Sequence, residues 1–220
     1  MTSRTSPFTR LRYSAAAVLA ASALVLTACN GGGNPPGNDP TSLSTSESAS
    51  ASATPSPAPT PSAAYKPADA KGKAQNVPVP VLPEAAKAET KEGLEAFAKH
   101  WYDLMNYAYE TGDLAPVSAV SGPNCASCNK VRDTLVAWNS DGQWIEGGTL
   151  AVQSADTKYA KDANGNYQVI VQYQRQAISY HLADGSVEES SPKTNLLADI
   201  VIANYESGRW TAINVDKIGG

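Results

Sequence analysis

The stretch of residues 30–83 decides how much of this chain can build a folded core. It consists mostly of Ser, Thr, Ala, Pro and Gly, and it holds 11 of the 15 prolines. Such a composition buries too little apolar surface to offset the entropy that a chain loses when it becomes ordered. We therefore expect residues 29–83 to form a disordered tether and residues 84–220 to form one globular domain.

The chain opens on a leader that is typical of an exported bacterial lipoprotein. Three arginines, at positions 4, 10 and 12, precede an apolar run of about 12 residues, which fits a signal peptide and is too short to span a bilayer. The run ends in Leu26-Thr27-Ala28-Cys29, the pattern of a lipobox. We expect residues 1–28 to be a signal peptide and Cys29 to carry the lipid that anchors the chain to the outer face of the cytoplasmic membrane. The alternative is an ordinary cleaved signal that happens to contain a cysteine.

The charge of the exported chain excludes one class of partner. Removal of the leader leaves 14 of the 17 basic residues against 21 acidic ones, a net charge of −7. An acidic protein is a poor partner for nucleic acid or for anionic lipid. We therefore expect no nucleic acid partner.

Apolar residues from Thr90 to Glu110 recur at helical spacing and predict a long amphipathic helix. Thr90 suits its N-cap, and Gly112 suits its end. No carboxylate lies on the apolar stripe, so this helix offers no general base to a cavity beside it. The polar stripe of the helix carries Glu95, Lys99, Asp103, Asn106 and Glu110. Two further helices are expected at about residues 114–120 and 125–139.

After Gly142 the hydrophobic period changes from helical to alternating, which predicts strands. We expect them near residues 144–159, 166–182, 195–206 and 209–218. The tight-turn pairs between them are Asn164-Gly165, Asp184-Gly185 and Ser207-Gly208. The alternation shifts around Gln176-Ala177, where a bulge is expected. Helices followed by an antiparallel meander predict an α+β domain.

One face of the second strand is rich in amides. The glutamines on it are Gln168, Gln172, Gln174 and Gln176. A stable dimer interface needs an apolar centre, and buried amides would need partners. We therefore expect this face to meet water and the folded domain to be monomeric.

Helices followed by long strands resemble the cone-shaped nuclear-transport-factor-two-like fold, which ketosteroid isomerases and SnoaL-like proteins share. The chain also resembles a family of actinobacterial lipoproteins with an extracytoplasmic domain of unknown function. The segments that carry this resemblance are Pro83-Glu84-Ala85-Ala86-Lys87, Thr90-Lys91-Glu92-Gly93, Ala96-Phe97, Trp101-Tyr102, Asn106-Tyr107-Ala108-Tyr109, Thr111-Gly112-Asp113, Cys125-Ala126-Ser127-Cys128 and Trp144-Ile145-Glu146-Gly147-Gly148. The resemblance implies N-terminal helices packed on a curved antiparallel sheet. It implies no activity.

Cys125 and Cys128 form a C-x-x-C motif at the expected start of the third helix. An exported pair is expected to be oxidised, which favours a structural disulfide. A redox role stays open, because the dipole of a helix N-terminus lowers a thiol pKa. Zinc would need two more ligands, and His100 and His181 are far from the pair in sequence. We expect no metal.

One cation is expected to face the core. If the second strand keeps its alternation, Arg175 follows Tyr173 on the core-facing side, where a cone fold has its cavity. An inward arginine needs an anionic partner, which is Asp199, Glu146 or a bound anion. The candidate aromatic walls of this pocket are Trp101, Tyr107, Trp144 and Tyr173.

The features together favour a membrane-anchored extracytoplasmic lipoprotein whose domain is a non-catalytic binding or scaffold module. Its partner is an unknown cell-envelope protein or a small ligand, and we expect no cofactor. We predict no catalytic residue, because no matched acid and base, nucleophile elbow or phosphate loop is present. The alternative is a small-molecule-binding or enzymatic domain that uses the cavity between the first helix and the sheet. A third class, thiol–disulfide exchange, rests on the C-x-x-C motif alone.

Overall fold

The computed structural model describes residues 63–219, and the statements below concern these residues. The expected signal peptide, Cys29 and the larger part of the expected tether lie outside them.

Three α-helices open the domain, namely α1 (Lys91–Thr111), α2 (Ala115–Ala119) and α3 (Ala126–Asn139). The hydroxyl of Thr90 accepts the N–H of Gly93 at 3.0 Å and caps the start of α1. Gly112 ends the helix in the left-handed region, with a φ of 77°. Both ends of the longest helix are therefore where the sequence places them.

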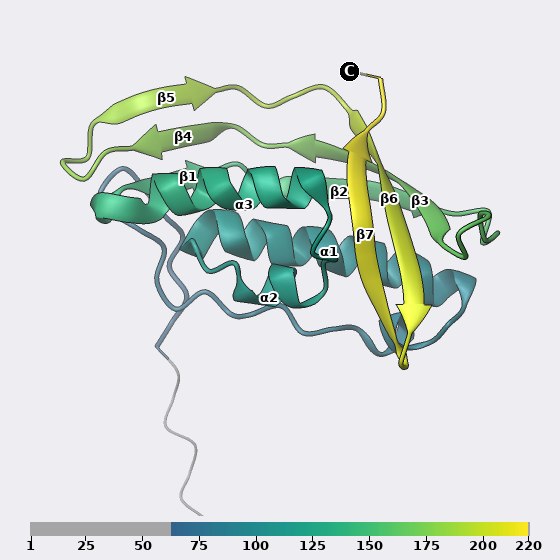
Figure 1. Cartoon of the computed structure of the whole chain (residues 1–220). Coiled ribbons are helices and arrows are strands. Elements are labelled where there is room, and N and C mark those ends of the chain that lie inside the picture. Colours follow the sequence, from purple (N-terminus) through teal and green to yellow (C-terminus); the bar gives the residue numbers. More distant parts are fainter. Residues whose placement is uncertain (1–62, 220) are drawn as a thin grey trace, which may run out of the picture. The chain divides into compact units, whose positions relative to one another are not determined.

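Seven strands follow the helices, in two antiparallel sheets with the orders β1-β4-β5 and β2-β3-β6-β7. Their bounds are β1 (Trp144–Gly147), β2 (Leu150–Asp156), β3 (Tyr167–Arg175), β4 (Ile178–His181), β5 (Val187–Ser191), β6 (Leu197–Glu206) and β7 (Arg209–Lys217). Helix α1 packs on β1, β2, β3 and β7, and α3 packs on β7 and β1. Figure 1 shows β6 and β7 running steeply across the direction of α1 and α3. The expected α+β class, with N-terminal helices packed on antiparallel strands, is confirmed.

Each of the first two expected strands is interrupted by two residues outside any strand, and so forms two shorter strands. This interruption is called the break below. Gly147 and Gly148 have φ values of 74° and 76°, and they separate β1 from β2. The expected irregularity at Gln176-Ala177 separates β3 from β4. The N–H of Gly148 donates to the carbonyl of Ala177 at 2.8 Å, and the N–H of Gln176 donates to that of Thr149 at 2.8 Å. The two sheets are thus joined by backbone hydrogen bonds across the break.

Strand β5 was not expected from the sequence. Its first four residues are exposed, so they show no alternation between apolar and polar positions. The strand forms because its backbone pairs with β4. A strand that lies in water on both faces leaves no hydrophobic pattern to detect.

The glutamine face of β3 lies outward as expected, with Gln168 and Gln172 exposed and Gln174 and Gln176 partly buried. The monomeric state of the domain stays a prediction.

The ordered part of the chain begins earlier than the expected domain start at Glu84. Lys66 and Gln75 are joined by two backbone hydrogen bonds, of 2.9 and 3.0 Å. The indole N–H of Trp144 donates to the carbonyl of Asp69 at 2.9 Å. The expected end of the tether at Pro83 is therefore too late.

The reason for this difference is the kind of contact that orders residues 63–83. The segment contributes a backbone carbonyl to Trp144 and the hydroxyl of Tyr65 to Glu110, with an O–O distance of 2.5 Å. Leu82 alone of its larger apolar side chains packs partly buried against the core. Hydrogen bonds from the domain to a backbone carbonyl do not depend on side-chain composition, so composition could not reveal them.

Candidate functional site

A cavity of about 650 Å³ lies between α1, α3 and the strands. This volume is within the range of small-molecule sites, roughly 300–1,000 Å³. Aromatic side chains supply much of its wall. They are Trp101, Tyr102, Tyr109, Trp138, Tyr173 and Tyr180. A smaller cavity of about 220 Å³ lies beside α2 and the start of α3.

A carboxylate lies in the wall of the larger cavity. Asp199 on β6 is 7 % exposed, and it accepts a hydrogen bond from the hydroxyl of Tyr102 at 2.7 Å and from that of Tyr173 at 3.3 Å. Burial raises the pKa of the Asp199 carboxyl, and the two hydroxyls and Lys217 oppose part of this rise. Burial also raises the pKa of both tyrosines, with the charge of Asp199 as the second cause. Both oxygens of the carboxylate are therefore engaged with neutral donors.

Arg175, at the end of β3, lines the same cavity and is partly buried. Alternate residues of β3 from Tyr167 to Tyr173 are buried, and Arg175, two residues further along the strand, lies in the lining of the cavity. Two of the three expected partners, Asp199 and Glu146, are engaged elsewhere, and the third, a bound anion, stays a prediction. Asp199 is held by two tyrosines, and Glu146 bonds to Nε2 of His181 at 2.7 Å. Within residues 63–219, the guanidinium takes part in no ion pair and no side-chain hydrogen bond.

The positive charge of Arg175 reaches three tyrosines of the cavity wall. Burial raises the pKa of Tyr109, Tyr173 and Tyr180, and the charge of Arg175 lowers each of them in part. The hydroxyls of Tyr109 and Tyr180 have no hydrogen-bond partner among the described residues. One end of the cavity thus gathers a guanidinium and two free hydroxyl donors.

Two of the expected aromatic walls lie elsewhere. The hydroxyl of Tyr107 donates to Asp113 at 3.3 Å, away from the cavity. Trp144 stacks on His181 with a centroid distance of 4.9 Å and an interplanar angle of 2°. The break at Gly147 places Trp144 in the other sheet, and the sequence alone did not show this division. Trp101 and Tyr173 do line the cavity.

Four aromatic wall residues were missed, namely Tyr102, Tyr109, Trp138 and Tyr180. Tyr109 lies eight residues after Trp101, about two helical turns, so both are on one face of α1. The helical periodicity could therefore have predicted Tyr109 as a wall residue. Trp138 and Tyr180 come from α3 and β4, and their rings meet edge to face at 5.0 Å. No local pattern predicts that contact, because it depends on how α3 packs beside the strands.

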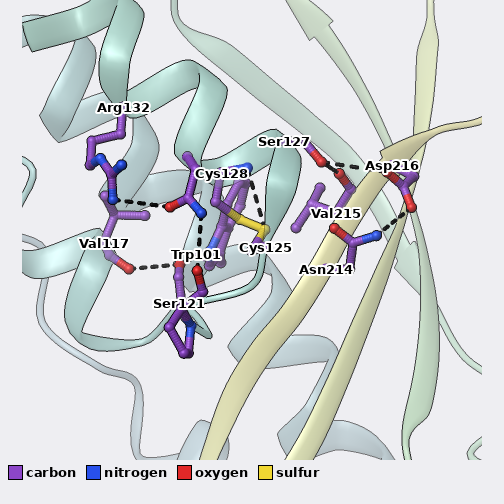
Figure 2. Close-up of a disulfide and its surroundings, with 12 residues drawn as sticks. Trp101, Val117, Ser121, Cys125, Ser127, Cys128, Arg132, Asn214, Val215 and Asp216 are labelled. Carbon is purple, nitrogen blue, oxygen red and sulfur yellow. Dashed lines mark hydrogen bonds between the residues drawn. A yellow bond between two sulfur atoms is a disulfide. The ribbon is translucent and has the colours of Figure 1, made fainter.

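The C-x-x-C pair forms the expected disulfide, which Figure 2 shows at the start of α3. Cys125 is the N-cap residue and is fully buried, and its sulfur accepts the N–H of Cys128 at 3.3 Å. Chain entropy gives such a short loop only about 2 kcal/mol of stabilisation. Ser127, next to it, donates to the carbonyl of Val215 and ties α3 to β7. Since an exchanging cysteine must be reached by its substrate, the burial of Cys125 favours the structural interpretation.

Among residues 63–219 there is no group of three or more side chains that could hold a metal ion. Within the same range, no helix has the length and apolar composition needed to cross a membrane.

One comparison with known proteins gives a family, and it supplies no activity. The model of a family described as "Family of unknown function (DUF6318)" matches residues 63–216. No curated protein matches the chain. One similar solved structure is that of the intermembrane space region of the chloroplast protein ARC6, at 9% identity and a TM-score of 0.45, covering 60% of this chain and 98% of that one. Another is Aln2 from a Streptomyces species, at 11% identity and a TM-score of 0.33, covering 55% and 85%. At these TM-scores neither likeness carries an argument.

Proposed function

Because the chain belongs to the family of unknown function DUF6318, we propose its function from the cavity itself: the domain binds a small, largely apolar molecule without converting it. A lipid on Cys29 displays this domain on the outer face of the cytoplasmic membrane. The observation that carries the proposal is the cavity of about 650 Å³ with six aromatic side chains in its wall. Binding sites for small molecules are mostly apolar, with some polar groups that fix the orientation of the ligand. Here the aromatic and aliphatic side chains are accompanied by six charged ones, Lys130, Arg175, Glu189, Asp199, Asp216 and Lys217.

The polar groups of the cavity favour binding over catalysis. A general base needs a lone pair that can reach the substrate proton. Asp199 has tyrosine hydroxyls on both oxygens, and Asp216 accepts the side-chain amide of Asn214 at 2.5 Å. Glu189 lies on the exposed strand β5. Asp199 is paired with Tyr102 and Tyr173, and because burial and the charge of Asp199 raise the pKa of both tyrosines, the two phenols act as hydrogen-bond donors to it.

Binding of a neutral aromatic molecule tests the proposed cavity. N-phenyl-1-naphthylamine, whose fluorescence rises in apolar surroundings, is expected to bind the purified protein saturably and one to one. Val131→Trp, on the cavity side of α3, is expected to weaken this binding at least about 10-fold, because the new ring occupies the space of the probe.

The matched control is Val136→Trp, which places the same side chain on the exposed side of the same helix, where Val136 is 58 % exposed. This variant is expected to bind the probe like the wild type. Equal binding by the wild type and by Val131→Trp would contradict a ligand site in the cavity.

The anchor is tested separately. Cells that express the protein are fed a fatty acid with an alkyne tag, and the wild type is expected to become labelled. Cys29→Ala is expected to remain unlabelled and to keep its leader, because the peptidase of the lipoprotein route needs the lipidated cysteine. Equal labelling of the two proteins would rule out the anchor and leave the cavity proposal intact.

A further inference from the structure

The geometry points to an organic anion as the ligand: an apolar, aromatic-compatible body in the cavity with a carboxylate, phosphate or sulfonate group on Arg175. This inference rests on the proposed function and adds the charge of the ligand to it. The two have separate tests, because a cavity can bind an apolar body whether or not the ligand carries a charge.

Arg175 is a partly buried cation that has no anionic partner among the described residues. A guanidinium that is withdrawn from water loses hydration, and proteins compensate with a carboxylate or another acceptor. The two buried or half-buried carboxylates that could have served, Asp199 and Glu146, are bonded to tyrosines and to His181. Arg175 is thus a cation at the wall of a cavity, with its donors directed to no acceptor in the described chain.

Two hydroxyl groups accompany Arg175. Tyr109 and Tyr180 line the cavity close enough for the arginine charge to act on their hydroxyls. A phenol can donate one hydrogen bond, and a guanidinium can donate up to five in a planar fork. An oxyanion is the group that accepts from all of them at once, and a charge-assisted bond is stronger than a neutral one.

The position of Arg175 along β3 separates it from the buried carboxylate. Arg175 lies four residues after Val171, which pairs with Asp199, so the Cα atoms of Arg175 and Asp199 are offset by about 13 Å along the strands. Asp199 accepts from Tyr102 and Tyr173, and among the described residues it forms no ion pair with Arg175. Between them lie Tyr173 and its partner Leu197, an aromatic and an apolar side chain. A ligand with an anion at one end and an apolar body at the other matches this order.

Four other charged side chains line the cavity, and they change how strongly it attracts an anion. Lys130 and Lys217 add positive charge, while Glu189 and Asp216 add negative charge. Glu189 acts on Tyr180 in the opposite sense to Arg175, so it lies near the same end. It competes with an incoming anion, and its removal is therefore expected to strengthen anion binding.

The test uses two probes that differ by one group. 1-anilinonaphthalene-8-sulfonate is N-phenyl-1-naphthylamine with a sulfonate added, so the ratio of their affinities isolates the anion. We expect the purified protein to bind the sulfonate about 10-fold more tightly than the neutral probe, the value of one partly exposed charge-assisted hydrogen bond. Arg175→Gln is expected to bring the ratio to about 1, and Arg175→Lys to keep an intermediate ratio, because a point charge remains without the fork.

Each outcome decides between the two proposals. Binding of neither probe overturns the proposed function. Binding of both with a ratio that Arg175→Gln leaves unchanged overturns the anion assignment alone. If Arg175→Gln also loses the neutral probe, the variant has lost its cavity, and Glu189→Gln decides instead. The Glu189→Gln variant is expected to bind the sulfonate about 2- to 3-fold more tightly than the wild type at low salt, and to bind the neutral probe with unchanged affinity. No rise with Glu189→Gln would then overturn the assignment.

Discussion

Trp210→Ala is expected to lower the free energy of unfolding by about 4 kcal/mol, the largest stability loss for a single truncation in this domain. Trp210 on β7 is 2 % exposed. Its ring lies 6.4 Å from that of Phe97 on α1, 5.3 Å from Tyr167 on β3 and 4.9 Å from Tyr205 on β6. The side chain thus joins the first helix to three strands, and its removal leaves a void that the rigid sheet cannot close.

The indole N–H of Trp210 also donates to the carbonyl of Ala88 at 2.9 Å, just before α1. Trp210→Phe keeps most of the packing and loses this bond, so it is expected to cost about 1 kcal/mol for the bond, with a smaller packing loss. Urea titrations followed by far-ultraviolet circular dichroism measure both variants. A loss below about 1 kcal/mol for Trp210→Ala would contradict the central position of this side chain.

Gly147→Ala is expected to cost at least about 3 kcal/mol and to disturb the cavity as well as the stability. A Cβ at this position would lie 2.3 Å from the carbonyl oxygen of Ala177, which is backbone. That oxygen accepts the N–H of Gly148 at 2.8 Å and so joins the two sheets at their break. Relief of the clash requires this hydrogen bond to lengthen, which moves β4 relative to β3.

The matched control is Gly165→Ala. Gly165 also has a positive φ, of 82°, but nothing lies within 4 Å of a Cβ built there. This variant is expected to cost only the left-handed strain, about 1 kcal/mol. The difference between the two variants in chemical denaturation measures the clash at the break. Equal losses would show that the break between the sheets tolerates a side chain.

The local elements of this fold were predictable from sequence because their signals are local. Thr90 and Gly112 mark the two ends of α1, and alternation over residues 167–175 marks β3 and the inward direction of Arg175. The disulfide between Cys125 and Cys128 follows from their spacing and the expected compartment.

Contacts between side chains that are far apart in the sequence were not predictable in the same way. Tyr102 and Asp199 are 97 residues apart in sequence, and no pattern in either segment announces their hydrogen bond. Trp144 was placed with the cavity because the break at Gly147 could not be located from alternation. Residues 63–83 were assigned to the tether because their hydrogen bonds to the domain are largely made by the backbone. Such bonds leave no signal in the amino-acid composition.

The central claim is that the cavity takes an organic anion through Arg175, and a crystal structure of the purified protein with 1-anilinonaphthalene-8-sulfonate tests it most directly. We predict that the aromatic rings lie between Tyr173 and Trp138 and that a sulfonate oxygen lies within hydrogen-bond distance of the guanidinium. A probe in the cavity with its sulfonate turned away from Arg175, or a probe bound only outside the cavity, would contradict this claim.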